Sequence, residues 1–302
     1  MDLNNLPTHC LDQGYSTTRR VLKVNNPQFS EYSDALYGGL RTKGYGKATS
    51  VDNPLITVII PVRNGAGTLG EAIKSVINQS YSNVELIIVD GQSDDGSVDI
   101  IREYEHCIDF WVSRPDKGAY DAMNRATTLA SGERIHFLGS DDILLDCFHM
   151  ISSLMRDPMA IYYGDVLSSR KNKPIGGPFS LRRLIRKNIP HQAIFYPRSV
   201  FDNYSYNLRY KIAADYLLNV RCFTEGRYRF VYIPYRIAVF NDIDGLSSRY
   251  IDEAFSIDEQ EIRKEYFPKT IYYEYIFREF FRRIERRLKR ISGKSGHTKT
   301  HI

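Results

Sequence analysis

The sequence predicts an α/β fold in which a mainly parallel central sheet is flanked by helices and followed by a helical C-terminal extension. Between residues 55 and 142, short runs of β-branched and apolar residues alternate with segments whose apolar residues recur at helical spacing. This alternation is typical of the strand and helix units that build a parallel sheet. After residue 250, only the helical spacing recurs.

Four strands are expected. LITVIIPV (55–62) and VELIIVD (84–90) are nearly continuous apolar runs, as expected for strands that are buried on both faces. DFWVSRP (109–115) and RIHFLGSDD (134–142) are shorter runs that predict the third and fourth strands.

Three helices are expected between these strands. The first covers residues 67–80, where four apolar residues share one face: Leu69, Ile73, Val76 and Ile77. The second begins near Asp95 and Ser97, which supply N-capping chemistry. The third covers residues 117–132 and ends at Gly132.

The composition is ordinary for a soluble globular protein. Of 302 residues, 42% are hydrophobic and 25% are charged. The four cysteines stand far apart and form no CxxC pair, which argues against a disulfide framework and a thiolate zinc site and suits a reducing compartment. The sequence has no signal-peptide pattern and no apolar run of about 18 residues, so we expect a cytoplasmic protein.

The basic charge is concentrated near the C-terminus. The net charge is +5, but residues 278–294 alone contain eight Lys or Arg residues and two Glu. A chain-wide nucleic-acid surface is therefore not expected. In residues 270–294, an apolar helical stripe lies opposite arginines, which is typical of a helix that lies on an anionic membrane surface, here the inner face of the cell membrane. A helix packed on the domain or an oligomer contact would show the same pattern.

The chain divides into three regions. Residues 1–52 show no sustained period and predict an irregular segment that packs on the domain. Residues 53–250 contain the predicted sheet, and residues 251–302 form the basic amphipathic tail, of which 292–302 are expected to be disordered.

Polar residues stand at the carboxyl ends of three predicted strands: Arg63 and Asn64, then Asp90, then Asp141 and Asp142. Ligands of such sheets bind beyond these strand ends. A solvated turn explains one pair of carboxylates easily, but it explains less well why three successive strand ends are polar.

These motifs resemble those of family 2 glycosyltransferases, which have the GT-A fold. The resemblance rests first on PLITVIIPVRNGAGTLGEAIKSVINQSYSNVELIIVDGQSDDGS and on RPDKGAYDAMNRATTLASGERIHFLGSDD, where SDD stands at the family's metal-binding DxD position. HQAIFYPRSVF and IAADYLLNVRCF match acceptor-side segments of a bacterial polysaccharide and glycolipid branch. The motifs run in the family's order and spacing from about Pro54 to Ser248.

The resemblance implies a GT-A catalytic domain over residues 53–250. It also implies transfer of a hexosyl or N-acetylhexosaminyl group from a nucleotide-diphosphate donor, usually a UDP-sugar, to a glycan or lipid-linked acceptor in surface polysaccharide assembly.

For the metal, the resemblance implies Asp142 as the direct ligand and Asp141 as a contact to the ribose or to the water shell of the metal. Mn²⁺ or Mg²⁺ would bridge both phosphates and stabilise the charge that develops as the glycosidic bond breaks. Ser140 occupies the family's first, variable acidic position, so this site has one carboxylate fewer. The alternative for the two aspartates is a capped turn.

For the nucleoside, Asp90 matches the carboxylate that binds the base, because a carboxylate accepts from the uracil N3–H, which cytosine lacks. Gly91 stands where the family frequently has a second Asp. Pro61, Val62 and Arg63 would line the base and ribose pocket. A helix cap or turn carboxylate is the alternative for Asp90, and a surface charge is the alternative for Arg63.

Lys117 and Asp121 match positions that line the donor pocket, and Gly118 would let the backbone approach the donor closely. Asn124 and Arg125 correspond to a segment that holds the donor sugar or packs under it. A solvated loop lysine is the alternative for Lys117.

Asp215 matches the carboxylate that removes the proton of the attacking acceptor hydroxyl. Its alternative is a helix N-cap. His191 and Gln192 fit a loop that contacts the acceptor or the donor sugar, although a lone histidine is often structural. One base without a second nucleophile indicates a single displacement with inversion.

Residues 240–250 resemble the family's flexible segment that closes over the donor. The QxxRW-type motif and the membrane spans of processive members are absent from this region, which favours transfer of one sugar per encounter.

Two other functions fit the fold. A sugar-nucleotidyltransferase would carry a glycine-rich, Arg- or Lys-bearing loop after the first strand, which PVRNGAGTLGEA does not show convincingly. A noncatalytic nucleotide- or glycan-binding protein is the second alternative, and the presence of both Asp142 and Asp215 favours an enzyme.

Overall fold

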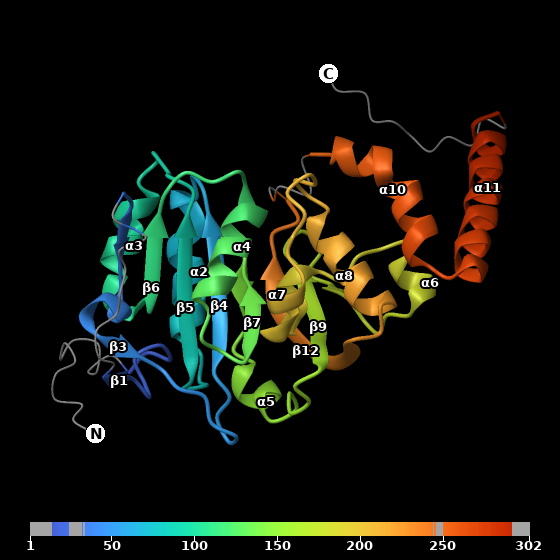
Figure 1. Cartoon of the computed structure of the whole chain (residues 1–302). Helices are drawn as coiled ribbons and strands as arrows, with labels where there is room; N and C mark the ends of the chain where they lie inside the picture. Colours follow the sequence, from blue (N-terminus) through green and yellow to red (C-terminus); the bar gives the residue numbers. More distant parts are fainter. Residues whose placement is uncertain (1–13, 24–31, 33, 244, 246–249, 292–302) are drawn as a thin grey trace.

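The computed structural model describes residues 14–23, 32, 34–243, 245 and 250–291. Its main feature is a ten-stranded mixed sheet in the order β2-β6-β5-β4-β7-β11-β9-β12-β8, with β10 paired to β9 (Figure 1). The strands are β1 (Leu22–Lys23), β2 (Leu36–Gly38), β3 (Tyr45–Gly46), β4 (Ile56–Val62), β5 (Val84–Asp90), β6 (Phe110–Ser113), β7 (Arg134–Phe137), β8 (Ile143–Leu144), β9 (Ala160–Ser168), β10 (Pro174–Ile175), β11 (Ile194–Pro197) and β12 (Arg229–Phe240).

The helices and 3-10 turns are η3 (Leu40–Lys43), α2 (Ala66–Ile77), α3 (Ser97–Glu103), η4 (Glu105–Cys107), α4 (Ala119–Leu129), α5 (Phe148–Ser152), α6 (Leu181–Leu184), η5 (His191–Ala193), α7 (Ser199–Asn203), α8 (Ala214–Thr224), α10 (Glu253–Tyr266) and α11 (Lys269–Ile291).

The four predicted strands form the parallel half of the sheet. β4 pairs in parallel with β5 and β7, and β5 pairs in parallel with β6. Because parallel strands end at the same edge, the residues that follow β4, β5 and β7 lie on one side of the molecule. The predicted parallel sheet is confirmed.

Helices cover both faces of this half. Val58 and Ile60 belong to the core beneath α2 and α3, whereas Ile59 and Ile87 belong to the core beneath α4. Successive strand residues point to opposite faces, so the continuous apolar runs reflect burial on both sides. The predicted apolar face of the first helix is buried in α2, and α4 ends before the predicted Gly132.

The other half of the sheet is mixed. β11 is antiparallel to β7 and to β9, and β12 is parallel to β9 and antiparallel to β8. β8 directly follows the SDD motif. Its pairing with β12 therefore brings the end of β12 next to that motif.

Part of the N-terminal segment belongs to the sheet. β2 pairs with β6 at the sheet edge, and β1 pairs with β3. The expected packing on the domain is present, but the expected lack of regular structure over residues 1–52 is wrong for these strands. Contacts to distant residues, which leave no periodic pattern, order this stretch. Residues 1–13, 24–31 and 33 lie outside the described residues.

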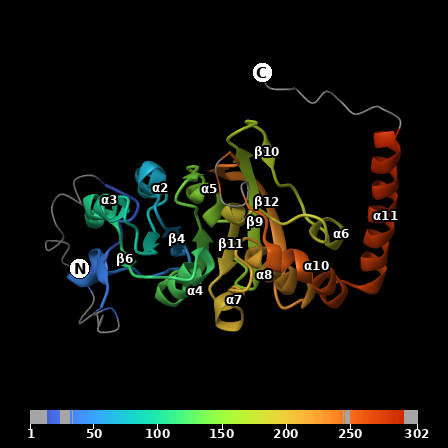
Figure 2. The same cartoon turned by 90° about the horizontal axis from the view of Figure 1, so that it is seen from above.

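The C-terminal helices α10 and α11 lie at the end of the molecule opposite β1 and β3 (Figure 1, Figure 2). α11 packs against α6 and α10. Within the described ranges, no helix combines the length and apolar character that crossing a membrane requires. Residues 292–302, which are expected to be disordered, lie outside the described residues.

Candidate active site

Three strand ends meet at one edge of the sheet. Val62 and Asp90 are paired at the ends of β4 and β5, and residues 138–142 leave β7 on the other side of β4. A Cβ on Gly65 would stand 2.8 Å from Val62 Cγ2 and 3.1 Å from Ser140 Oγ. The structure therefore brings Val62, Asp90 and Ser140 to the same edge.

The Asp90 carboxylate is fully buried and holds the turn after β5. Its Oδ2 accepts from the Ser93 amide and the Ser113 hydroxyl, and its Oδ1 accepts from the Ser93 hydroxyl. These contacts match the turn-carboxylate alternative. A carboxylate has about four acceptor positions, so Oδ1 keeps one position beyond its contact with Ser93.

Asn64 and Gln92 lie in the loops beyond β4 and β5 and have φ values of 53° and 60°. This left-handed conformation is uncommon for residues other than glycine. The Asn64 amide donates to Ser93 Oγ at 2.8 Å, and Asn64 Oδ1 accepts from the Asp94 amide at 3.1 Å. The two loops are thus fixed to each other beside Asp90.

Arg63 is exposed, whereas Pro61 before it is half-buried. A Cβ on Gly91 would lie 2.5 Å from Asp116 Oδ2 and 3.3 Å from Arg63 Cδ. Glycine at position 91 therefore leaves room for Arg63 and Asp116 to approach the loop after β5.

The two aspartates after β7 are held by distant residues. Asp142 is only 2% exposed; its Oδ2 accepts from Gln192 Nε2 and its Oδ1 from the Asn241 amide, both at 2.8 Å. The half-buried Asp141 accepts from Asn241 Nδ2 at 3.2 Å. Burial raises the pKa of Asp142, and the neighbouring Asp141 charge raises it further. In a local capped turn the carboxylates would bind neighbouring residues, whereas Gln192 and Asn241 are distant in the sequence.

Gly139 lies beneath both carboxylates. A Cβ at this position would stand 2.5 Å from Asp142 Oδ2 and 2.9 Å from Asp141 Oδ1. Both acidic side chains therefore bend toward one point. Like charges in such an arrangement repel unless a cation or a proton compensates them.

The donor set fits a metal that binds together with a diphosphate. Mg²⁺ is usually held by one or two carboxylates, substrate phosphates and water. Across the described parts of the chain, no group of three or more His, Cys, Asp or Glu side chains could hold a metal ion. Two carboxylates, Asp141 and Asp142, suit a site whose other ligands come from the diphosphate and water. This agrees with a serine, and not a third acidic residue, at position 140.

Asn241 reaches the aspartates because of the register between β12 and β8, in which Val239 faces Ile143. A Cβ on Gly245 would lie 3.7 Å from Asp141 Oδ2, so the segment after β12 continues past the same carboxylate. Residues 244 and 246–249 of the segment expected to close over the donor lie outside the described residues.

Asp215 lies in the first turn of α8 and is 7% exposed. Its Oδ1 accepts from the Tyr120 hydroxyl at 2.9 Å and the Tyr216 amide at 2.8 Å, and its Oδ2 accepts from Asn188 Nδ2 at 2.7 Å. Burial raises the pKa of Asp215. The N-cap of α8 is Ala213, so Asp215 does not serve as that cap.

The Tyr120 hydroxyl faces two acceptors, Asp215 Oδ1 at 2.9 Å and the Ile212 carbonyl at 2.7 Å. A hydroxyl has one hydrogen to donate. A protonated Asp215 would satisfy both contacts, because it would donate to the Tyr120 oxygen. The geometry and the raised pKa therefore agree that this site takes up a proton readily.

His191 and Gln192 connect the two acidic groups. Gln192 binds Asp142, and His191 Nδ1 lies 3.7 Å from Asp215 Oδ2. The His191 side chain is 25% exposed, and its positive charge would lower the pKa of both carboxyl groups. Neighbouring residues of one 3-10 turn thus join the aspartate pair to Asp215.

A chain of amides runs from Asp215 into the core. Asn188 Oδ1 accepts from Asn219 Nδ2 at 2.9 Å, and Asn219 Oδ1 accepts from the Tyr196 hydroxyl at 2.7 Å. The tyrosine hydroxyl donates at the end of the chain, so each amide is oriented in turn. Asn188 therefore presents its NH₂ group to Asp215.

The residues around the start of α4 have mostly internal partners. Asp121 accepts from the Lys117 amide at 3.0 Å and pairs with Arg125 at 2.7 Å. Asn124 binds both backbone groups of Tyr206. The Lys117 side chain is exposed. Of the side chains in this group, it is therefore the most accessible to a ligand.

Sequence reasoning missed Tyr120, Asn188 and Asn241. Tyr120 lies inside the quoted motif PDKGAYDAMN, and Asn188 lies three positions before His191. Asn241 carried a positional signal, because it follows the apolar run that becomes β12. Nothing in residue type separates these three from ordinary polar residues.

A family model described as Glycosyl transferase family 2 matches residues 57–217. The chain is 37% identical over 214 residues to a PGL/p-HBAD biosynthesis glycosyltransferase of Mycobacterium bovis, covering 67% of this chain and 82% of that protein. It is 33% identical over 129 residues to the UDP-Glc:alpha-D-GlcNAc-diphosphoundecaprenol beta-1,3-glucosyltransferase WfgD of Escherichia coli, covering 42% and 51%.

Among the solved structures that are similar at 17% sequence identity are two with a bound nucleotide sugar. S. aureus TarS 1–349 in complex with UDP-GlcNAc matches with a TM-score of 0.57 over 70% of this chain and 64% of that chain. The mannosyltransferase PcManGT from Pyrobaculum calidifontis, in complex with GDP-Man and Mn²⁺, matches with a TM-score of 0.53 over 66% and 61%. At this identity, the likeness concerns the fold.

Proposed function

Because this chain belongs to glycosyl transferase family 2 and has the predicted GT-A fold, we propose that it transfers one sugar from a UDP-sugar to a glycan or lipid-linked acceptor in surface polysaccharide or glycolipid assembly. The observation that carries the proposal is the link between Asp142 and Asp215 through Gln192 and His191. At one end of this link is a pair of carboxylates that suits a metal bound to a diphosphate. At the other end is a single buried carboxylate that suits proton transfer.

The uridine donor is supported by relatives and by the sheet edge. WfgD uses UDP-Glc by its name, and TarS binds UDP-GlcNAc. In this chain, Pro61, Val62 and Arg63 would line the nucleoside pocket, and Asp90 would accept from the uracil N3–H. Lys117, which is exposed, would offset phosphate charge, while Asp121 would hold the Lys117 loop.

Asp142, with Asp141 beside it, would hold Mn²⁺ or Mg²⁺, and a bound metal would stabilise the charge of the departing diphosphate. A fold neighbour binds Mn²⁺ together with its donor. Gln192 and Asn241 keep Asp142 in place while it carries a charge that burial disfavours. Ser140 contributes a hydroxyl at the same edge.

Asp215 would act as the base. The acceptor oxygen forms a bond to the anomeric carbon as the bond from that carbon to the phosphate oxygen breaks, UDP leaves with the bond electrons, and Asp215 takes the hydroxyl proton. A single displacement inverts the configuration, so an α-linked donor gives a β-linked product. His191, partly exposed beside Asp215, would contact the acceptor or the donor sugar.

The acceptor is proposed to be lipid-linked. The name of WfgD describes a diphosphoundecaprenol acceptor, and the basic amphipathic tail suits peripheral attachment to the cytoplasmic face of a membrane.

Two variants separate donor binding from catalysis. Asp142→Asn should lose the metal-dependent part of UDP-sugar binding, because one ligand charge is gone. Asp215→Asn should keep donor binding but lower kcat by about 10²–10⁴-fold, which is the usual contribution of a general base. Calorimetric titration of donor with and without Mn²⁺, together with product assays, measures both.

Unchanged turnover in Asp215→Asn would contradict the assignment of the base. Donor binding without turnover in the parent protein, with every acceptor class tested, would favour a noncatalytic binding protein.

A further inference from the structure

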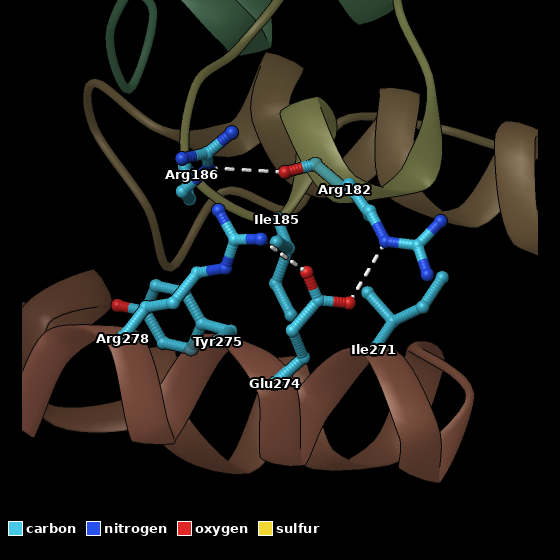
Figure 3. Close-up of a pocket in the computed structure, with 7 residues that line it drawn as sticks. All are labelled: Arg182, Ile185, Arg186, Ile271, Glu274, Tyr275 and Arg278. Carbon is cyan, nitrogen blue, oxygen red and sulfur yellow. Dashed lines mark hydrogen bonds and ion pairs between the residues drawn. The ribbon is translucent and has the colours of Figure 1, made fainter.

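α11 meets the rest of the protein through one side of its first turns. Ile271 and Tyr275 pack against the domain core, and the Arg263 guanidinium lies 4.6 Å from the centre of the Tyr275 ring. Glu274 accepts from Arg182 Nε at 2.8 Å. Figure 3 shows this junction, in which α11 side chains point toward the α6 segment.

Another side of α11 is exposed and apolar. Its large side chains are 38% to 64% exposed and, apart from the adjacent pair of phenylalanines, recur at intervals of three or four residues: Tyr273, Phe277, Phe280, Phe281, Ile284 and Leu288. This spacing places them in one stripe along the helix. A soluble surface rarely exposes so many large apolar side chains together, so the stripe indicates a docking surface.

The charge around the stripe is strongly positive. α11 contains eight Lys or Arg residues and three Glu. At its junction with the α6 segment, Arg182, Arg186 and Arg278 line a small cavity, where Glu274 is the one acidic lining residue (Figure 3). Glu274 pairs with two of these arginines, so the junction retains positive charge.

The positive charge of α11 distinguishes between two possible partners for the stripe, a second copy of the chain and a lipid surface. A second copy of the chain would bring two arginine-rich helices together, and like charges at an interface oppose association. An anionic lipid surface satisfies both features, because phosphate groups attract the arginines while the acyl boundary accepts the aromatic stripe.

We propose that the exposed stripe of α11 and the basic junction with α6, together the α6–α11 surface, dock the protein on an anionic lipid bilayer. The aromatic side chains enter between the headgroups, and Arg182, Arg186 and Arg278 contact lipid phosphates. The helix then lies in the plane of the membrane surface.

This surface leads directly to the proposed catalytic centre. From Arg186 the chain continues through Lys187 to Asn188, which binds Asp215 at 2.7 Å. Docking therefore places the acceptor side of the centre next to the lipid. This last step rests on the proposed function, whereas the docking itself does not.

Vesicle flotation of the full chain tests the docking. We expect the protein to float with phosphatidylcholine vesicles that contain phosphatidylglycerol, to float poorly with phosphatidylcholine alone, and to be released by high salt. Partitioning should fall about fivefold for each neutralised arginine in Arg182→Gln/Arg186→Gln/Arg278→Gln. It should fall at least about tenfold in Phe277→Ser/Phe281→Ser.

Matched controls use exposed side chains elsewhere. Met150→Ser/Leu154→Ser removes two side chains that are 55% and 46% exposed, and Arg170→Gln/Lys171→Gln/Lys173→Gln removes exposed charges between β9 and β10. Both controls should float like the parent protein. Thermal melting of each variant checks that it is folded.

Equal flotation of the parent and the variants of the α6–α11 surface would overturn the proposal. So would stripe-dependent dimerisation in sedimentation without vesicle binding, which would assign the stripe to a second copy. Slow UDP-sugar hydrolysis, measured without vesicles, separates the two proposals. Vesicle binding without hydrolysis would support the docking and contradict the proposed function. Hydrolysis without vesicle binding would support the proposed function and contradict the docking.

Discussion

Asp215 combines two features that oppose each other. A base must be ionised to accept a proton, yet burial raises the pKa of this carboxyl group. Asn188 and the Tyr216 amide donate to it, and donors stabilise the charged form. The site therefore keeps a carboxylate with strong proton affinity in a fixed position, which suits general base catalysis.

This balance predicts how stability depends on pH. Because its pKa is raised in the folded protein, protonated Asp215 contributes stability that is fully present below its ordinary value of 3.8 and is lost as the pH rises through the folded-state pKa. Asp215→Asn lacks this titration. As the pH rises above that ordinary value, the parent should lose stability relative to the variant in urea denaturation, and a constant difference would contradict the raised pKa.

Asn188→Ala tests the positioning of the base. Loss of the donor to Oδ2 should raise the pKa of Asp215 further and move the acid limb of the kcat/KM profile to higher pH. Asn203→Ala is a matched control, because that side chain donates to the Ser199 carbonyl away from the site. An acid limb that stays in place in Asn188→Ala would show that this amide does not tune the base.

At the scale of single residues, the sequence predicted acidic groups better than their partners. Asp142 and Asp215 carry chemistry that a motif can reveal. Asn241 and Asn188 act only because strand register and the amide network bring them to those carboxylates. For Asp90, the contacts to Ser93 and Ser113 match the turn alternative, and base binding stays a prediction.

At the scale of elements, a buried ion pair ties the segment after β3 to the start of β6. The Lys47 ammonium lies 3.0 Å from the Asp109 carboxylate, with side-chain exposures of 0% and 3%. Burial lowers the pKa of Lys47 and raises the pKa of Asp109 to about 6. Each charge therefore helps to stabilise the other, with further support from Glu85 for Lys47 and from Arg41 for Asp109.

Lys47→Met should lower the free energy of unfolding by about 3–5 kcal/mol, because it leaves Asp109 buried without its partner. Adding Asp109→Asn should recover part of this loss. Lys74→Met, which breaks the exposed pair with Glu71, should lower the free energy of unfolding far less, because solvent screens an exposed ion pair. Urea denaturation of the parent, Lys47→Met, Asp109→Asn, the double variant and Lys74→Met measures these differences, and purely additive losses at positions 47 and 109 would contradict the coupling.

Periodicity predicted the elements that local sequence determines. The strands β4 and β5 are long apolar runs, and α2 has a clear apolar face. β2 is three residues long and owes its place to pairing with β6. Such a short strand carries no period, so the sequence alone gave no reason to place it in the sheet.

At the scale of the whole molecule, the features follow one another along the sheet. The strand ends proposed for the nucleoside belong to the parallel half, the carboxylate pair stands at its border, and α8 with Asp215 leads toward α6 and α11 (Figure 1). This order would let a soluble donor enter from one side while an acceptor at a lipid surface approaches from the other.

Thermal melting with a panel of nucleotide sugars, with and without Mn²⁺ or Mg²⁺, tests the central claim most directly. At about 100 times its Kd, a ligand contributes about 2.7 kcal/mol, which corresponds to a rise in Tm of about 4 °C for a chain of this length. We predict this rise for a UDP-sugar with metal, accompanied by slow donor hydrolysis, and its loss in Asp142→Asn. Absence of stabilisation by every uridine nucleotide with either metal would contradict the account.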